Sequence, residues 1–117
     1  MKTAVITGSS RGIGFATARL LADRGWNLVI NGGHDQEALR QAAEELSQIT
    51  RTDAFYGDVS LEEYACGIIN RAMDTYGQID LLINNAGISH IGLLSDMSTA
   101  QWRQVMQTNL DAVFFTC

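Results

Sequence analysis

The stretch Thr7-Gly8-Ser9-Ser10-Arg11-Gly12-Ile13-Gly14 decides the fold of this chain. It directly follows the apolar run Ala4-Val5-Ile6 and leads into a segment with helical periodicity. Where a strand turns into a helix, the first N–H groups of the helix are unpaired and point at the loop, and the helix dipole adds positive charge there. The stretch therefore predicts a phosphate-binding turn after the first strand.

The three glycines of this stretch have separate tasks. Gly8 permits a tight turn, Gly12 lets a ligand approach the backbone, and Gly14 lets the helix lie close to the strand. Their spacing, Gly-x-x-x-Gly-x-Gly, differs from the Gly-x-Gly-x-x-Gly of the common dinucleotide fingerprint, and no Gly-Lys-Ser/Thr of a P-loop follows. By itself the stretch leaves one alternative open, a turn whose glycines serve packing alone.

Apolar runs and helical periodicities alternate along the rest of the chain. The predicted strands are Thr3 to Thr7, Asn27 to Asn31, Thr52 to Tyr56 and Asp80 to Asn84. The predicted helices are residues 13–24, a helix capped by Asp35 whose apolar positions reach Ile49, one opened by a capping box at Ser60 and ending near Tyr76, and one capped by Ser98 that runs from about Thr99 to the end.

This order of elements predicts an α/β fold. Strands joined by helices of this length form a parallel sheet that is covered on both faces, with right-handed crossovers. We expect the strand order 3-2-1-4, the first part of a doubly wound, Rossmann-type sheet, truncated after the fourth strand and its following helix. The length of 117 residues fits a single dinucleotide-binding domain, residues 1–117.

Composition excludes several classes of function. A net charge of −5 disfavours nucleic-acid binding, although backbone N–H groups can still hold a phosphate. No stretch approaches the ~20 apolar residues that span a bilayer, and the start of the chain does not read as a signal peptide. Cys66 and Cys117 match no metal spacing. We expect free thiols, no metal site and a cytoplasmic location.

A second motif, Asn84-Asn85-Ala86-Gly87, follows the apolar run Leu81-Leu82-Ile83. With the glycine stretch before it, and with Asp58-Val59 and Asn109-Leu110 in order and spacing, it resembles the short-chain dehydrogenase/reductase family over the whole chain. Within that family the pattern is most similar to 3-oxoacyl-carrier-protein reductases and related sugar and polyol dehydrogenases. The resemblance implies an oxidoreductase that transfers a hydride between a nicotinamide and a small carbonyl or alcohol substrate.

The resemblance also implies which residues bind the cofactor. The pyrophosphate and adenosine-ribose region would be lined by Gly8, Ser10, Arg11, Gly12, Ile13 and Gly14. Asp58 would bind the adenine amino group beside Val59, and the cofactor's ribose would pass Asn85, Ala86 and Gly87.

Asn109 would interrupt its helix and hold a water in a proton relay. Plainer interpretations stay open for several of these residues. Asp58 could only start a turn, Asn84 and Asn85 could be turn residues, and Asn109 could lie on a polar helix face.

The end of the second predicted strand bears on the choice of cofactor. Enzymes that prefer NAD place Asp or Glu there to hold the ribose 2′-hydroxyl. Here the position falls at about Gly32, between Asn31 and Gly33, while Arg11 offers a positive charge nearby. We therefore predict NADP(H) rather than NAD(H). His34 could add a contact or be a solvated loop residue.

The sequence holds no Tyr-x-x-x-Lys. In the family a tyrosine acts as acid/base, a lysine lowers its pKa and a serine orients the substrate, because an isolated phenol titrates near ~10. The tyrosines are Tyr56, Tyr64 and Tyr76, and the residues four positions on are Ser60, Ile68 and Asp80.

Two interpretations follow. The chain is either the N-terminal part of a longer reductase or a catalytically inactive nucleotide-binding or interaction module. The apolar edge at Leu81-Leu82-Ile83 and the apolar end of the last helix predict self-association. A homo-oligomer is also expected because the helix from Thr99 commonly forms a subunit interface in the family.

Overall fold

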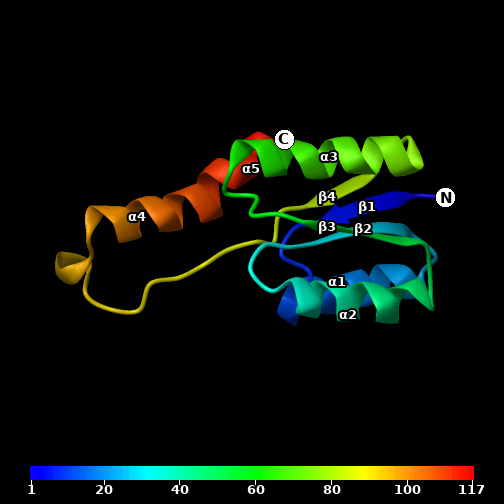
Figure 1. Ribbon diagram of the computed structural model, residues 1–117, viewed down its shortest axis with the longest axis horizontal. Helices are drawn as coiled ribbons and strands as arrows, with labels where there is room; N and C mark the ends of the chain where they lie inside the picture. The colour runs from blue at the N-terminus through cyan, green and yellow to red at the C-terminus, as the bar shows by residue number, and fades with distance from the viewer.

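A computed structural model describes residues 1–117 and contains one parallel sheet of four strands (Figure 1). The strands are β1 (Thr3–Ile6), β2 (Asn27–Gly32), β3 (Thr52–Tyr56) and β4 (Leu81–Ile83), in the order β3-β2-β1-β4. Every pairing is parallel, and Val5 of β1 lies opposite both Val29 and Leu82. The predicted α/β class, sheet type and strand order are confirmed.

Helices cover both faces of the sheet. They are α1 (Gly12–Asp23), α2 (Gln36–Ser47), α3 (Glu62–Tyr76), α4 (Thr99–Met106) and α5 (Ala112–Thr116), with a 3₁₀ turn η1 (Leu94–Asp96) and a π-helical stretch η2 (Gln107–Asp111). Figure 1 shows α1 and α2 below the sheet and α3 with α5 above it.

The alternation of side chains along the central strands divides the core in two. Ile6 and Ile30 pack with buried residues of α1 and α2, whereas Val5 and Val29 pack with buried residues of α3 and α5. All four side chains are fully buried, and each such burial stabilises the fold by about 1.5–3 kcal/mol. Because β1 and β2 are covered on both sides, their carboxyl ends are held rigidly.

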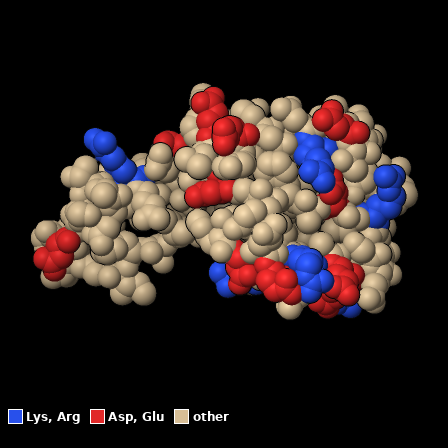
Figure 2. All heavy atoms as spheres, viewed as in Figure 1, with Lys and Arg blue, Asp and Glu red and all other residues tan.

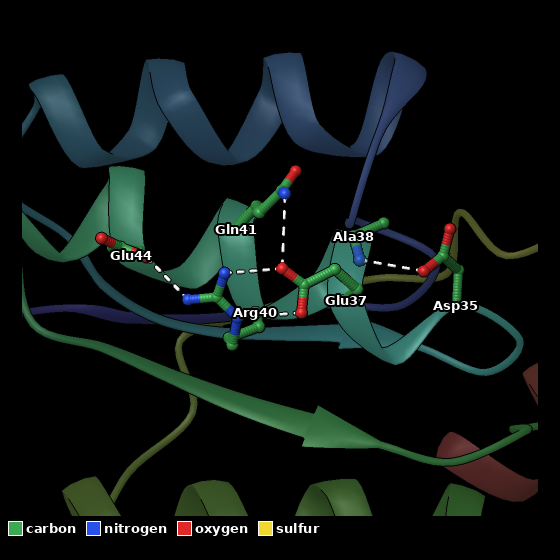
Figure 3. A network of polar contacts seen from close by, with 6 residues as sticks. All are labelled: Asp35, Glu37, Ala38, Arg40, Gln41 and Glu44. Atoms are coloured by element: carbon green, nitrogen blue, oxygen red, sulfur yellow. Dashed lines mark hydrogen bonds and ion pairs between the residues drawn. The ribbon is translucent and has the colours of Figure 1, made fainter.

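The cap of α2 forms as predicted. Asp35 accepts a hydrogen bond from the Ala38 amide at 3.0 Å (Figure 3). On the exposed side of the helix, Arg40 bridges Glu37 and Glu44, and its hydrogen bond holds the pKa of Glu37 below its ordinary value. The helix ends at Ser47, so Ile49 lies beyond it rather than in its last turn.

The predicted capping box at Ser60 is wrong. The Ser60 amide donates to Asp58 Oδ1 at 3.0 Å, and this local turn delays the start of α3 to Glu62, with Leu61 as an N-cap that makes no side-chain bond. The end of the helix is as predicted, because Gly77 closes it with a φ of +76°.

The last predicted helix is interrupted at Asn109, as the family resemblance implied. The Ser98 capping box forms, and the π-helical stretch η2, which contains Asn109, separates α4 from α5. The segment with η1 and α4 projects from the body of the sheet, and α5 returns to pack against α3 (Figure 1). The longest dimension of the molecule is therefore 48 Å, about twice the other two.

Candidate cofactor-binding site

A cavity of about 240 Å³ lies at the carboxyl ends of the strands. Residues that directly follow β1, β3 and β4 line it, together with the end of β2. The strand order changes direction between β1 and β4, and clefts at such points are where open α/β sheets bind ligands. The fold thus brings four loops that are distant in sequence to one site.

Most of the predicted cofactor-binding residues meet at this cavity. Those that line it are Gly8, Ser10, Arg11, Asp58, Val59, Asn85, Ala86 and Gly87. Gly12, Ile13, Gly14 and Asn109 do not line it. Ile13 is 80% exposed at the start of α1, and Gly14 is buried behind the turn.

The turn between β1 and α1 presents unpaired amides. Gly8 adopts a φ of +60°, a conformation that suits glycine, and Gly12 adopts +64°. The amides of Gly12, Ile13 and Gly14 have no hydrogen-bond partner, and the N-cap residue Arg11 makes no side-chain cap bond. Three free amides, the helix dipole and the Arg11 charge suit an anion at this end of α1.

Gly14 sits where no larger residue fits. A Cβ there would lie 2.5 Å from the Gly8 carbonyl oxygen, 2.6 Å from Asn85 Nδ2 and 2.9 Å from the Ser9 Cα. Close packing of α1 against the turn therefore depends on glycine at this position, as the sequence predicts.

The end of β4 is tied to the glycine turn by two side chains. The Thr7 hydroxyl accepts hydrogen bonds from the amides of Asn85 and Ala86, at 3.1 and 3.0 Å. Asn85 Nδ2 donates to the Gly8 carbonyl at 2.9 Å. The turn-residue interpretation of Asn85 is therefore incomplete, because its side chain joins two walls of the cavity.

We expect Thr7→Val to lower the free energy of unfolding by about 1–3 kcal/mol, because it leaves the Ala86 amide without an acceptor and the Asn85 amide with only the Ile83 carbonyl. Thr7 is 2% exposed, and valine conserves its shape. Thr7→Ser, the matched control, keeps the oxygen and loses one methyl group, which costs about 1 kcal/mol. Urea unfolding of both variants measures this, and an equal loss in the two would contradict the role of the hydroxyl.

The region after β2 contains the residues relevant to cofactor choice. Gly32, Gly33 and His34 line the cavity together with Arg11. Asp35 also lines the cavity, although the prediction of NADP(H) from the sequence did not take its carboxylate into account. One oxygen of Asp35 caps α2. The sequence signal that could have placed Asp35 here is its position as the N-cap of the helix that follows β2, because this position lies near the carboxyl end of that strand.

Asp58 both holds a turn and lines the cavity, so the turn interpretation and a position at the proposed adenine site are compatible. Its Oδ1 accepts from the Ser60 amide and holds the turn, and the residue lines the cavity next to Val59, which is 3% exposed. A Cβ on Gly33 would lie 3.0 Å from the Asp58 Cα, so the walls after β2 and β3 are in close contact.

Asn109 acts on the cavity through Ile88. It lies in η2, its Oδ1 accepts from the Ile88 amide at 2.8 Å, and its Nδ2 donates to the Ile88 carbonyl at 2.7 Å. Ile88 lines the cavity, as does Thr108. Asn109 is therefore not an ordinary polar-face residue, because both polar atoms of its side chain fix the loop after β4.

None of the three tyrosines lines the cavity. Tyr76 donates to the Leu28 carbonyl at 2.9 Å, at the amino end of β2. Burial, with the charge of Asp53, raises the pKa of the Tyr76 phenol, which moves it further from neutral pH. No tyrosine in the chain is thus placed to exchange a proton at this site.

The structure contains no group of three or more His, Cys, Asp or Glu side chains that could hold a metal ion. None of its helices combines the length and apolar character needed to cross a bilayer. Cys66 and Cys117 are exposed and unpaired.

The sequence model of the family described as "short chain dehydrogenase" matches residues 2–117. The chain belongs to the short-chain dehydrogenase family. The resemblance seen in the motifs is confirmed. A 3-oxoacyl-(acyl-carrier-protein) reductase FabG from Chlamydia muridarum is 39% identical over 118 residues, which are 99% of this chain and 47% of that protein. The chain spans about half the length of the curated relatives it matches.

Solved structures of a reductase and a dehydrogenase have the same fold. An L-sorbose reductase from Gluconobacter frateurii, complexed with NADPH and L-sorbose, matches with a TM-score of 0.93 at 28% identity, covering 98% of this chain and 44% of that one. An alcohol dehydrogenase from Thermococcus sibiricus, complexed with 5-hydroxy-NADP, matches with a TM-score of 0.92 at 33% identity, covering 99% and 50%.

Proposed function

We propose that this chain is the cofactor-binding part of an NADP(H)-dependent oxidoreductase, which transfers a hydride between the nicotinamide and a carbonyl or alcohol group of a small molecule. The observation that carries the proposal is the cavity between the β1–α1 turn and the end of β4, with three unpaired amides at the start of α1. A dinucleotide of this class would supply the hydride chemistry, and the chain would bind and orient it.

The residues present fit such a cofactor. The amides of Gly12 and Ile13, at the exposed start of α1, would bind phosphate oxygens, and Asp58 and Val59 would hold the adenine. Asn85, Ala86 and Gly87 would border the ribose next to the nicotinamide. Asn109 would keep the loop after β4 in place and hold a water for proton relay.

Preference for NADP(H) is part of the proposal. Arg11 lines the cavity beside Gly32 and Gly33, neither of which carries a charge that would repel a 2′-phosphate. Asp35 also lines the cavity, and its negative charge would repel a 2′-phosphate. One of its oxygens is held by the Ala38 amide at the start of α2. The NADPH and 5-hydroxy-NADP complexes of the two structural neighbours support the same preference.

Calorimetric titration with 2′,5′-ADP and 5′-AMP tests this proposal. We expect 2′,5′-ADP to bind at least about tenfold more tightly, because the second phosphate adds a charge-assisted contact. Arg11→Ala should remove most of that difference, whereas Arg24→Ala, on the C-cap of α1, should leave it unchanged. Equal affinity for the two ligands in the unchanged chain would overturn the NADP(H) assignment, and no binding of either would overturn the cofactor site.

We expect no turnover from the 117-residue chain itself, because it contains no Tyr-x-x-x-Lys and no tyrosine at the cavity. The measurement is NADPH oxidation with a generic ketone, on protein whose intact mass has been verified. Turnover by such a chain would mean that other residues supply the acid/base step. Binding without turnover agrees with both a longer reductase and an inactive nucleotide-binding module, and the family membership favours the former.

The substrate is proposed only as a class. Relatives that match include a 3-oxoacyl-(acyl-carrier-protein) reductase and a sugar reductase, and both names describe reductases. A 3-oxoacyl carrier-protein thioester is the first substrate to try, given the greater identity to that relative.

We also propose a cytoplasmic homo-oligomer. Trp102, Leu110 and Phe114 are each about half exposed or more along the segment from α4 to α5. Figure 2 shows few charged side chains on that segment, in contrast to the mixed charges gathered over α2. Light scattering of the chain distinguishes an oligomer from a monomer.

A further inference from the structure

Asn31, near the carboxyl end of β2, uses every polar atom that it has. It is 2% exposed. Its side-chain Oδ1 accepts from the Gly8 amide at 3.0 Å, and its Nδ2 donates to the carbonyl oxygens of Phe55 and Gly57, both at 3.0 Å. Its main chain accepts from the Ser9 amide at 2.7 Å and donates to Ser9 Oγ at 2.9 Å.

These bonds join two walls of the cavity between which no other side-chain hydrogen bond forms. Gly8 lies in the β1–α1 turn, called the phosphate turn here (residues 7–11), and Gly57 directly precedes Asp58, on the side proposed for adenine. Asn31 itself also lines the cavity. The distance between the phosphate turn and the Gly57–Asp58 turn is therefore set by one amide side chain.

We propose that Asn31 is a positioning residue, which holds the phosphate turn and the Gly57–Asp58 turn at the separation that a 2′,5′-substituted adenosine spans. The inference rests on the proposed function. It concerns the geometry between two subsites and not the ability of either subsite to bind alone.

This bridge accepts one hydrogen bond and donates two, which an amide side chain can do and a hydroxyl, with a single proton, cannot. An apolar residue would leave the Gly8 amide and the carbonyls of Phe55 and Gly57 without these partners. An aspartate would set carboxylate oxygens against two carbonyl oxygens. The main-chain bonds to Ser9 do not depend on the side chain, so a variant keeps the turn attached to β2 and loses the link to β3.

The test compares a ligand that spans both walls with ligands that touch one. Asn31→Ala and Asn31→Thr are titrated in parallel with 2′,5′-ADP, adenosine and inorganic pyrophosphate, followed by backbone amide NMR. Threonine suits a strand and retains bulk, so it covers the case in which alanine prevents folding. We expect 2′,5′-ADP to bind about tenfold more weakly to both variants. The affinities for adenosine and for pyrophosphate should each change by less than about twofold, because each of these ligands contacts only one wall and does not depend on the separation of the two walls.

Asn27→Ala is the matched control, because Asn27 is a buried asparagine at the opposite end of the same strand, 7% exposed and with its Oδ1 unpartnered. It should leave 2′,5′-ADP affinity unchanged, because the Asn27 side chain makes no hydrogen bond to either wall of the cavity. The inference fails if the Asn31 variants bind 2′,5′-ADP normally, if all three ligands weaken equally, or if Asn27→Ala weakens 2′,5′-ADP as much. If the unchanged chain does not bind 2′,5′-ADP, the proposed function fails instead.

Discussion

Gly14→Ala is expected to lower the free energy of unfolding by about 3 kcal/mol and to weaken 2′,5′-ADP binding by more than about tenfold. The added Cβ would lie 2.5 Å from the Gly8 carbonyl oxygen, which belongs to the main chain and cannot rotate away. Alanine favours a helix over glycine by about 1 kcal/mol, which is too little to offset such a contact. The turn and α1 must therefore move apart, and the unpaired amides move with α1.

Gly12→Ala provides the control for that substitution. A Cβ at Gly12 meets nothing within 4 Å, so the cost there comes only from its φ of +64°, about 1–2 kcal/mol. Urea unfolding should rank Gly14→Ala as clearly more damaging than Gly12→Ala. The reverse order, or a Gly14→Ala chain as stable as the original, would contradict the close packing of α1 on the turn.

Gly32→Asp is expected to weaken 2′,5′-ADP by about 100-fold while changing 5′-AMP affinity by less than about threefold, because a carboxylate placed beside a phosphate costs several kcal/mol. Gly32 lines the cavity, and its φ lies outside the left-handed region, so the backbone accepts a side chain. A Cβ there would lie 3.3 Å from Ser10 Oγ, a contact that a small rotation of the Ser10 side chain relieves, and 3.4 Å from the Cβ atoms of Ser10 and Leu39, which is ordinary van der Waals contact.

Gly32→Asn separates charge from shape in this experiment. Asparagine has the volume of aspartate without its charge, so it should weaken 2′,5′-ADP only slightly. Calorimetry with both ligands on both variants gives the selectivity directly. If asparagine and aspartate weaken 2′,5′-ADP equally, the effect is steric, and the uncharged end of β2 is not what selects NADP(H).

The elements were predictable because their signals are local. The glycine turn, the apolar runs of β1, β2 and β4, the Asp35 cap and the Ser98 capping box each act within a few residues. Local signals can also compete, and this explains why the capping box predicted at Ser60 does not form. The Ser60 amide instead donates a hydrogen bond to Asp58, within the turn that precedes α3. The family resemblance implied that Asn109 interrupts its helix, and the π-helical stretch at residues 107–111 agrees with this. Helical periodicity alone did not predict it, because the two hydrogen bonds that accompany it join Asn109 to the distant Ile88.

The sequence alone determined the parallel α/β sheet and its strand order, because period, glycine spacing and motif order are properties of the chain itself. The family resemblance carried by those motifs implied half of the residues that line the cavity. Only the tertiary structure revealed that Asn31 bridges Gly8 to Gly57, that Thr7 clamps the end of β4, and that Asp35 reaches the cavity wall. These residues are distant from their partners along the chain. Their hydrogen bonds exist only once the strands have paired and all four carboxyl ends lie at one edge of the sheet.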